Sequence, residues 1–325
     1  MGDGTPTRTR VLLAFAAIYV IWGSTYLAIR FAIETLPPFL MAGTRFVIAG
    51  ALLYAWSRAR GAARPERIHW KTTAIVGGLL LLGGNGGVVW AEQRVPSGLA
   101  ALLVAALPVW MATMEWARGG IRPTAGVIGG LLLGLTGIGL LVGPGEFAGG
   151  AGADTLGAIV LVLASISWAA GSIYSRGASL PKSPLLTTGM EMLAGGGLLV
   201  LAGAVTGELG HLDLAAASTT SWLALLYLIV FGSLIGFTAY IWLLEVSTPA
   251  KVSTYAYVNP VVAVLLGWAL AGEPLSLRIA IAAGVIIAGV AMVTIARGEK
   301  PGAASTGPPS AIISRGRRRG RRKVA

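Results

Sequence analysis

The residues best suited to contact a small molecule are aromatic, amide and hydroxyl side chains that recur on helical faces. Trp22 and Tyr26 are four positions apart, and Trp168 and Ser172 repeat that spacing, so each pair shares one face of a helix. Asn85 lies inside the run GGNGG, where glycines leave space around its amide. A cavity lined by such groups would hold a molecule with both apolar and polar parts.

Three further residues complete this candidate substrate cavity: Tyr240, Tyr255 and Asn259. The aromatic members have a second interpretation, because tryptophan and tyrosine also anchor helices at membrane surfaces. Serine likewise packs helices against one another. Both interpretations stay open for each residue. The stronger candidates lie nearer the middle of an apolar segment: Trp22, Asn85, Trp168 and Asn259.

Three ionisable residues lie inside apolar segments, where a charge costs about 2.5–3.5 kcal/mol on insertion scales and is a functional candidate by default. Arg45 and Glu191 are 146 positions apart, the same separation as Trp22 and Trp168. Arg45 has either a structural or a gating role. Glu191 is either a proton-coupling group or an interfacial carboxylate with hydrogen-bonded neighbours. Glu115 is close to a segment end, which favours an interface role.

Motifs for catalysis are absent from the sequence. It contains no HExxH, no GxSxG, no aspartate-rich diphosphate motif and no GxxxxGK[ST] phosphate-binding loop. It has no cysteine, and its two histidines, His69 and His211, lie in connecting segments. We therefore expect no enzyme activity, no metal site and no cofactor. Any transport would use an ion gradient or the gradient of the substrate itself.

The elements that must position these residues are membrane helices. The 325-residue chain is 55% hydrophobic and 12% charged, whereas a soluble domain is usually about 25% charged. A spanning helix needs about 20 mainly apolar residues. Ten segments qualify: 11–33, 39–57, 72–91, 97–117, 124–143, 155–176, 184–206, 220–243, 250–271 and 276–296. We expect an all-α integral membrane protein with ten transmembrane helices.

These ten segments form two copies of one pattern. An offset of 146 residues places Trp168 under Trp22, and an offset of 152 places Gly236 under Gly84. Each copy has five segments, an odd number, so the second copy crosses the membrane in the opposite sense to the first. Inverted repeats of this kind place a substrate site near the bilayer midplane and support alternating access.

Two prolines occupy equivalent places in the repeats. Pro108 lies in segment 97–117 and Pro260 in segment 250–271, again 152 positions apart. A proline inside a helix frees a backbone carbonyl and kinks the axis. The pair is predicted to form symmetric bends, either as hinges of a gate or as tolerated kinks that neighbouring helices satisfy.

Charge sets the expected orientation, because lysine and arginine concentrate in cytoplasmic connections. The connection after residue 57 is strongly basic, and basic connections alternate along the chain with connections that are acidic or poor in positive charge. We therefore expect a protein of the cell membrane with both termini in the cytoplasm. The basic cluster Arg315–Lys323 is predicted to contact anionic lipid, with no nucleic acid bound. The expected divisions are a cytoplasmic segment 1–10, a first repeat 11–143, an external linker 144–154, a second repeat 155–296 and a disordered tail 297–325.

Three runs resemble the EamA-type drug/metabolite transporter superfamily: WGSTYLAIR, PSGLAALLVAALPVW and AKVSTYAYVNPVVAVLLGWALAGEPLS. The resemblance extends over about residues 11–296 and implies two inverted repeats around a central cavity. It also implies export of amino acids, other metabolites or toxic compounds. The family often carries Gly-Glu after its fourth and ninth helices. Here Gly272-Glu273 follows the ninth, but Gly120-Ile121 occupies the first place, so one side of a gate would work differently.

The resulting expectation is a secondary transporter that exports small metabolites by rocking one repeat against the other. Its expected partners are a small-molecule substrate, membrane lipid and protons as a candidate coupling ion. An importer of the same fold and a receptor or scaffold without transport are the alternatives. The sequence leaves the substrate, the direction of transport and the oligomeric state open.

Overall fold

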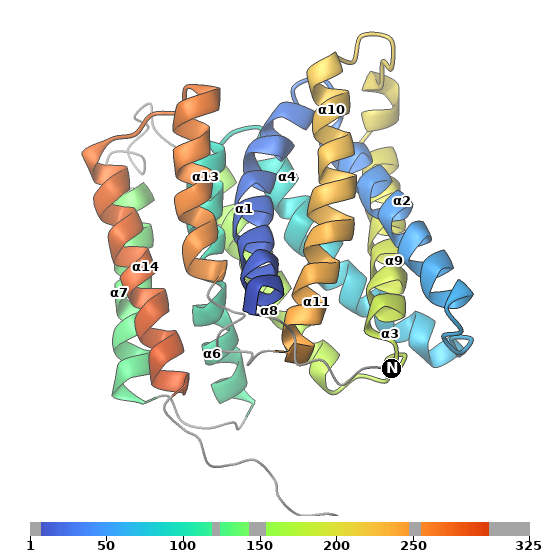
Figure 1. The fold of residues 1–325 in the computed structure, drawn as a ribbon. Coiled ribbons are helices and arrows are strands. Elements are labelled where there is room, and N and C mark those ends of the chain that lie inside the picture. The colour runs from blue at the N-terminus through green and yellow to red at the C-terminus, as the bar shows by residue number, and fades with distance from the viewer. Residues whose placement is uncertain (1–7, 119–123, 143–153, 247–254, 299–325) are drawn as a thin grey trace, which may run out of the picture.

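The computed structural model describes residues 8–118, 124–142, 154–246 and 255–298, and this part of the chain is helical with no strand. Long helices lie side by side in one bundle (Figure 1). The first half comprises α1 (Arg8–Ala32), α2 (Pro38–Ala59), α3 (Arg67–Gly77), η1 (Gly78–Gly86), α4 (Gly87–Ala91), α5 (Ser97–Val104), α6 (Leu107–Ala117) and α7 (Ala125–Val142). The predicted segment 1–10, linker 144–154 and tail 297–325 lie almost wholly outside the described residues.

The second half repeats this order with two differences, because it has an additional 3-10 helix, η2, and one helix, α13, where the first half has α5 and α6. It comprises α8 (Thr155–Arg176), α9 (Pro184–Val205), η2 (Glu208–His211), α10 (Thr219–Tyr227), η3 (Leu228–Ile235), α11 (Gly236–Val246), α13 (Tyr255–Ala271) and α14 (Leu277–Gly298). Within the described residues, seven helices are long and apolar enough to cross a membrane, and α7, α13 and α14 contain shorter apolar stretches. Every predicted segment overlaps one of these helices. That all ten cross the membrane stays a prediction.

The helix connections gather at two ends of the bundle. One end holds the α1–α2, α4–α5, α9–α10 and α13–α14 connections, and we call it the Glu92 end. The opposite end holds the α2–α3 connection, and we call it the Arg60 end. In Figure 1 the Glu92 end is at the top. Because consecutive helices are antiparallel, the last residues of one helix and the first residues of the next lie at the same end of the bundle.

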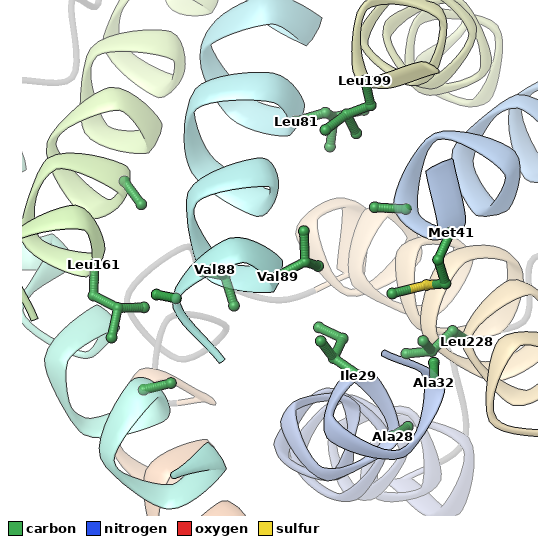
Figure 2. Packing of buried hydrophobic residues seen from close by; sticks show 14 of the residues in the cluster. Ala28, Ile29, Ala32, Met41, Leu81, Val88, Val89, Leu161, Leu199 and Leu228 are labelled. Atoms are coloured by element: carbon green, nitrogen blue, oxygen red, sulfur yellow. The ribbon is translucent and has the colours of Figure 1, made fainter. Parts of the chain in front are cut away.

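The largest buried cluster joins the two halves of the chain. Figure 2 shows Ile29, Met41 and Val89 from the first half near Leu199 and Leu228 from the second. All five are less than a tenth exposed. In a membrane the lipid is as apolar as these side chains, so close packing rather than hydrophobicity stabilises their association.

Glycines bring equivalent helices of the two halves into backbone contact. A Cβ atom added at Gly50 of α2 would lie 2.8 Å from the carbonyl oxygen of Gly189 in α9, and one at Gly43 would lie 3.0 Å from that of Gly196. In the same way α14 lies against α7, where a Cβ at Gly289 would meet the Gly130 carbonyl at 2.7 Å. Small residues at these positions let the helices of each pair pack closely.

The two predicted proline kinks differ in the structure. The span Ser97–Ala117 is interrupted at residues 105–106, because α5 ends at Val104 and α6 begins at Leu107, which places Pro108 in the first turn of α6. Proline is tolerated there since its missing N–H is not needed by the helix. Pro260, in contrast, lies inside the continuous helix α13. The two prolines therefore act differently on their helices.

Candidate functional site

Two π-helices lie at equivalent positions in the two halves. η1 spans Gly78–Gly86 between α3 and α4, and η3 spans Leu228–Ile235 between α10 and α11. Their first residues are 150 positions apart, close to the 152-residue offset that places Gly236 under Gly84. A π-helix widens the backbone turn and is rare, and it occurs frequently at functional sites. The run GGNGG around Asn85 was a signal for η1 alone, and nothing in the sequence pointed to η3.

Trp22 of α1 contacts the π-helix of the other half. Its indole Nε1 donates to the carbonyl oxygen of Gly232 at 3.2 Å. A Cβ atom added at Gly236 would overlap the same Nε1 atom, so only glycine leaves room for the ring. Gly232 has no side chain, which lets α1 approach η3 closely.

Trp168 of α8 makes the reciprocal contact in the other direction. A Cβ atom added at Gly84 of η1 would lie 2.7 Å from Trp168 Cε3. The neighbouring Ser167 Oγ donates to the carbonyl oxygen of Leu79 in η1 at 2.8 Å. In each repeat the tryptophan of the first helix thus rests on a π-helix glycine of the other repeat, and a donor reaches a π-helix carbonyl. The two predicted tryptophans occupy matching sites.

Trp22 is also the centre of an aromatic cluster. Its ring centroid lies 5.3 Å from that of Phe237, 5.2 Å from that of Tyr240 and 5.1 Å from that of Tyr255. The rings are tilted or edge-on, the arrangement that aromatic quadrupoles prefer. Three predicted cavity residues, Trp22, Tyr240 and Tyr255, are therefore brought together, with Phe237 as a member that we had not included.

Asn259 joins the same region from α13. With its amide nitrogen turned toward the carbonyls, it donates to Tyr19 O at 3.2 Å and to Tyr255 O at 3.1 Å. Its side chain is 8% exposed. These bonds link α13 to α1 one residue before Pro260, where the helix lacks a backbone donor.

Among the described residues, the remaining cavity candidates make no ring contact with this cluster. Ser172 donates to the Trp168 carbonyl of its own helix. Asn85, in η1, makes no hydrogen bond within the described part of the chain. Tyr26 is an electrostatic neighbour of Tyr255 on one side and of Glu92 on the other.

The two predicted charged candidates are not paired with each other. Arg45 is 4% exposed, and its Nε donates to Ser233 Oγ in η3 at 2.8 Å. Its guanidinium also lies 4.6 Å from the ring centroid of Phe46. Glu191 is half-buried and, among the described residues, makes no hydrogen bond or ion pair. Glu115 forms an ion pair with Arg176 at the Arg60 end, which agrees with its predicted interface role.

The Glu92 end holds carboxylates that sequence reasoning did not select as site residues. Glu273 accepts hydrogen bonds from the backbone N–H groups of Ser97 and Gly98, at 2.7 and 3.0 Å, and so caps the start of α5. Glu208 caps α2 in the same way, through Phe39 N at 3.1 Å and Leu40 N at 2.8 Å. An anion at a helix N-terminus satisfies unpaired N–H groups and the helix dipole.

Glu92 itself is enclosed at this end of the bundle. It is 0% exposed, and neither carboxyl oxygen has a hydrogen-bond partner among the described residues. The guanidinium of Arg30 donates to its backbone carbonyl at 3.2 Å. Nearby, Arg94 pairs with Asp154 at 2.8 Å. No cluster of three metal-binding side chains occurs in the described residues.

The arrangement of paired halves agrees with a comparison to known families. The model of the EamA-like transporter family matches residues 9–143 and 155–295. The chain belongs to the EamA-like transporter family. This EamA-like transporter is a multi-pass membrane protein, and the predicted family resemblance is confirmed.

Several relatives of this EamA-like transporter carry transporter names. The uncharacterized inner membrane transporter YedA of Escherichia coli (strain K12) is 43% identical over 286 residues, which cover 87% of this chain and 90% of that protein. The WAT1-related protein At3g02690, chloroplastic, of Arabidopsis thaliana is 26% identical over 304 residues, covering 92% of this chain and 72% of that protein. A crystal structure that is 24% identical, with a TM-score of 0.61, covers 89% of this chain and 99% of its own and shares the fold.

Proposed function

We propose that this EamA-like transporter is a secondary transporter that exports small metabolites, such as amino acids or related or toxic compounds. Ten transmembrane helices would form two inverted five-helix repeats, with both termini cytoplasmic and the Glu92 end outside. The observation that carries the proposal is the reciprocal contact of Trp22 and Trp168 with the π-helices of the opposite repeats. Equivalent contacts on the two repeats are what we expect if one repeat moves as a rigid body against the other.

The proposed mechanism is alternating access around a site between the repeats. Glycine contacts between α2 and α9 let the two helix backbones approach closely, and small sliding movements of packed helices are one way in which such proteins change shape. The aromatic cluster around Trp22 would separate the site from the Arg60 end, and the caps by Glu208 and Glu273 would close the Glu92 end. Opening one end while the other stays closed moves a substrate across the membrane.

The position of Arg45 favours a substrate that carries a carboxylate or another anionic group. Its guanidinium is buried between α2 and η3, and no acidic side chain in the described residues neutralises it. A buried charge without a partner is costly, and a bound anion would remove that cost. The rings of Trp22 and Tyr240 would contact the apolar part of the same molecule.

The test is efflux from proteoliposomes loaded with labelled amino acids, with and without a pH gradient. Loss of label that depends on active protein, relative to empty liposomes, supports transport. The native chain is compared with the Gly236→Leu variant in the same liposomes, because the added side chain would occupy the space of Trp22. Efflux by the native chain and none by this variant supports the proposed site.

The outcomes separate the alternatives. Uptake without efflux would indicate an importer of the same fold. If no amino acid, sugar, drug or phosphorylated metabolite moves in either direction, the chain is a receptor or scaffold and the proposal is wrong.

A further inference from the structure

Glu92 is a buried carboxyl group for which the transport site described above has no use. It follows the last turn of α4, where its backbone N–H bonds Val88 O at 2.9 Å. Its side chain is completely enclosed, and both oxygens lack hydrogen-bond partners in the part of the chain that the structure describes. An ionised carboxylate in such surroundings would lose its hydration with nothing in return, so a group placed there becomes neutral by binding a proton.

The charged neighbours of Glu92 come from two other elements. Arg30 of α1 lies beside it but bonds its backbone carbonyl and forms no ion pair with the carboxyl group. Glu273, from the α13–α14 connection, is a second acid close enough to oppose ionisation of Glu92. Tyr26 of α1 is its other titratable neighbour. Arg94 and Asp154, which also lie at this end, are paired with each other.

The carboxyl groups of Glu273 and Glu92 differ in their hydrogen-bond donors. Glu273 accepts two backbone N–H hydrogen bonds at the start of α5. Among the described residues, no donor reaches either carboxyl oxygen of Glu92. A proton on Glu92 therefore keeps a carboxylate without donors from being buried beside Glu273.

We propose that Glu92 is a proton-binding site whose proton is released when the Glu92 end opens. In the closed arrangement the carboxyl group is neutral. When the α5 cap by Glu273 separates and water enters, the O–H bond breaks, the proton passes to water, and the carboxylate stays behind. Arg30, already at the adjacent carbonyl, then becomes its ion-pair partner. This site would couple transport to the proton gradient, so the inference rests on the proposed function.

The first test does not depend on transport. Infrared spectra of the full-length protein in liposomes are recorded at neutral and alkaline pH, for the native chain and for Glu92→Gln. We expect a C=O stretching band of a protonated carboxyl group that persists at neutral pH and is missing in Glu92→Gln. The control is Glu34→Gln, which removes an exposed carboxylate at the same end and should leave the band unchanged.

A second variant covers the case in which Glu92→Gln does not fold. Glu92→Asp keeps a titratable group and should keep a protonated band at a shifted frequency. If the folded Glu92→Gln and native proteins give the same band, or if Glu92→Asp leaves the native band unmoved, Glu92 holds no proton and the inference is wrong.

The third test uses proteoliposomes containing a substrate that the native chain transports. For one proton per cycle, one pH unit of gradient changes the accumulation ratio about tenfold. We expect this response in the native chain and none in Glu92→Gln, which should still exchange labelled for unlabelled substrate. Native transport that ignores the gradient overturns the inference and leaves the proposed function intact. Absence of native transport overturns the proposed function, and the infrared spectra then decide the proton site alone.

Discussion

At the scale of single residues, the two tryptophans show that residues related by the sequence repeat make equivalent contacts. Trp22 and Trp168 are related by the sequence repeat, and each contacts a glycine of the π-helix in the opposite half. The contacts differ in detail, because Trp22 donates its own N–H, whereas beside Trp168 the donor is Ser167. Among the described residues, an aromatic cluster surrounds Trp22, with Tyr240 and Tyr255, but not Trp168. We therefore expect the two halves to contribute unequally to substrate contact.

Replacement of Trp22 tests this contribution. Trp22→Ala removes three ring contacts and the bond to Gly232 O, so we expect the transport rate to fall at least about tenfold, equivalent to about 1.4 kcal/mol of activation free energy. Membrane insertion should be unaffected. Trp116→Ala, which removes a tryptophan that is 52% exposed, is the matched control. Native rates in Trp22→Ala would exclude Trp22 from the transport site.

Asp154 gives a pH-dependent prediction at the start of α8, outside the predicted span. The hydrogen bond from Arg94, and then that from the Gly157 backbone, holds the pKa of Asp154 below its ordinary value. A depressed pKa adds stability above the unfolded value of about 3.9, and this is lost as the pH falls through the folded pKa. Asp154→Asn should therefore lower the unfolding temperature slightly at neutral pH. The difference from the native chain should vanish in acid; a constant difference would contradict the ionic explanation.

At the scale of helices, backbone contact between α2 and α9 is the main link between the repeats. Gly50 and Gly189 face each other at one level, and Gly43 and Gly196 at another. These two levels exchange under the 146-residue offset, as an inverted pair requires. The crossing therefore lies near the local axis that would relate the two halves.

Enlarging one of these glycines tests the helix contact. Gly189→Leu would press a side chain against the Tyr54 backbone N, 2.8 Å from the new Cβ, and we expect a loss of about 1–3 kcal/mol in stability. Unfolding in mixed detergent measures it. Gly197→Leu, on the same helix with nothing within 4 Å, should be close to native. Equal losses in both variants would mean that helix propensity, not the α2–α9 contact, causes the change.

At the scale of the whole molecule, the two ends of the bundle are unlike. Hydrogen bonds between separate elements concentrate at the Glu92 end, where Glu208, Glu273 and Arg30 each join two helices. Basic residues concentrate in the α2–α3 connection at the Arg60 end. By the positive-inside rule, we expect that end to face the cytoplasm.

The absence of cysteine allows a clean test of this orientation. In intact cells a membrane-impermeant maleimide should label Gln93→Cys, at the Glu92 end, and should label Ala63→Cys, at the Arg60 end, only after permeabilisation. Both positions are exposed. The reverse pattern would invert the topology, and with it the side on which Glu92 releases its proton.

The basic tail is expected to be dispensable for transport. A chain that ends at Lys300 keeps every described helix and loses the cluster Arg315–Lys323. We expect its efflux rate to equal the native rate at equal expression, measured in the same liposomes. A marked decrease would assign the tail a role in transport beyond contact with lipid.

The sequence by itself determined the membrane class, the positions of the helices, the internal repeat and the pairing of Trp22 with Trp168. These follow from local composition and from order along the chain, which need no tertiary structure. The sequence did not predict that the helix is interrupted before Pro108 yet continuous through Pro260, because proline fits both the inside of a kinked helix and its first turn.

Only the tertiary structure decided which polar groups are enclosed. Glu92 follows an apolar segment and precedes Gln93 and Arg94, the pattern of a solvated connection, yet the surrounding helices bury it completely. The hydrogen bonds of Glu273 to α5 and of Arg45 to η3 join residues more than a hundred positions apart. Burial and such bonds depend on which helices meet in space, and no local pattern contains that information.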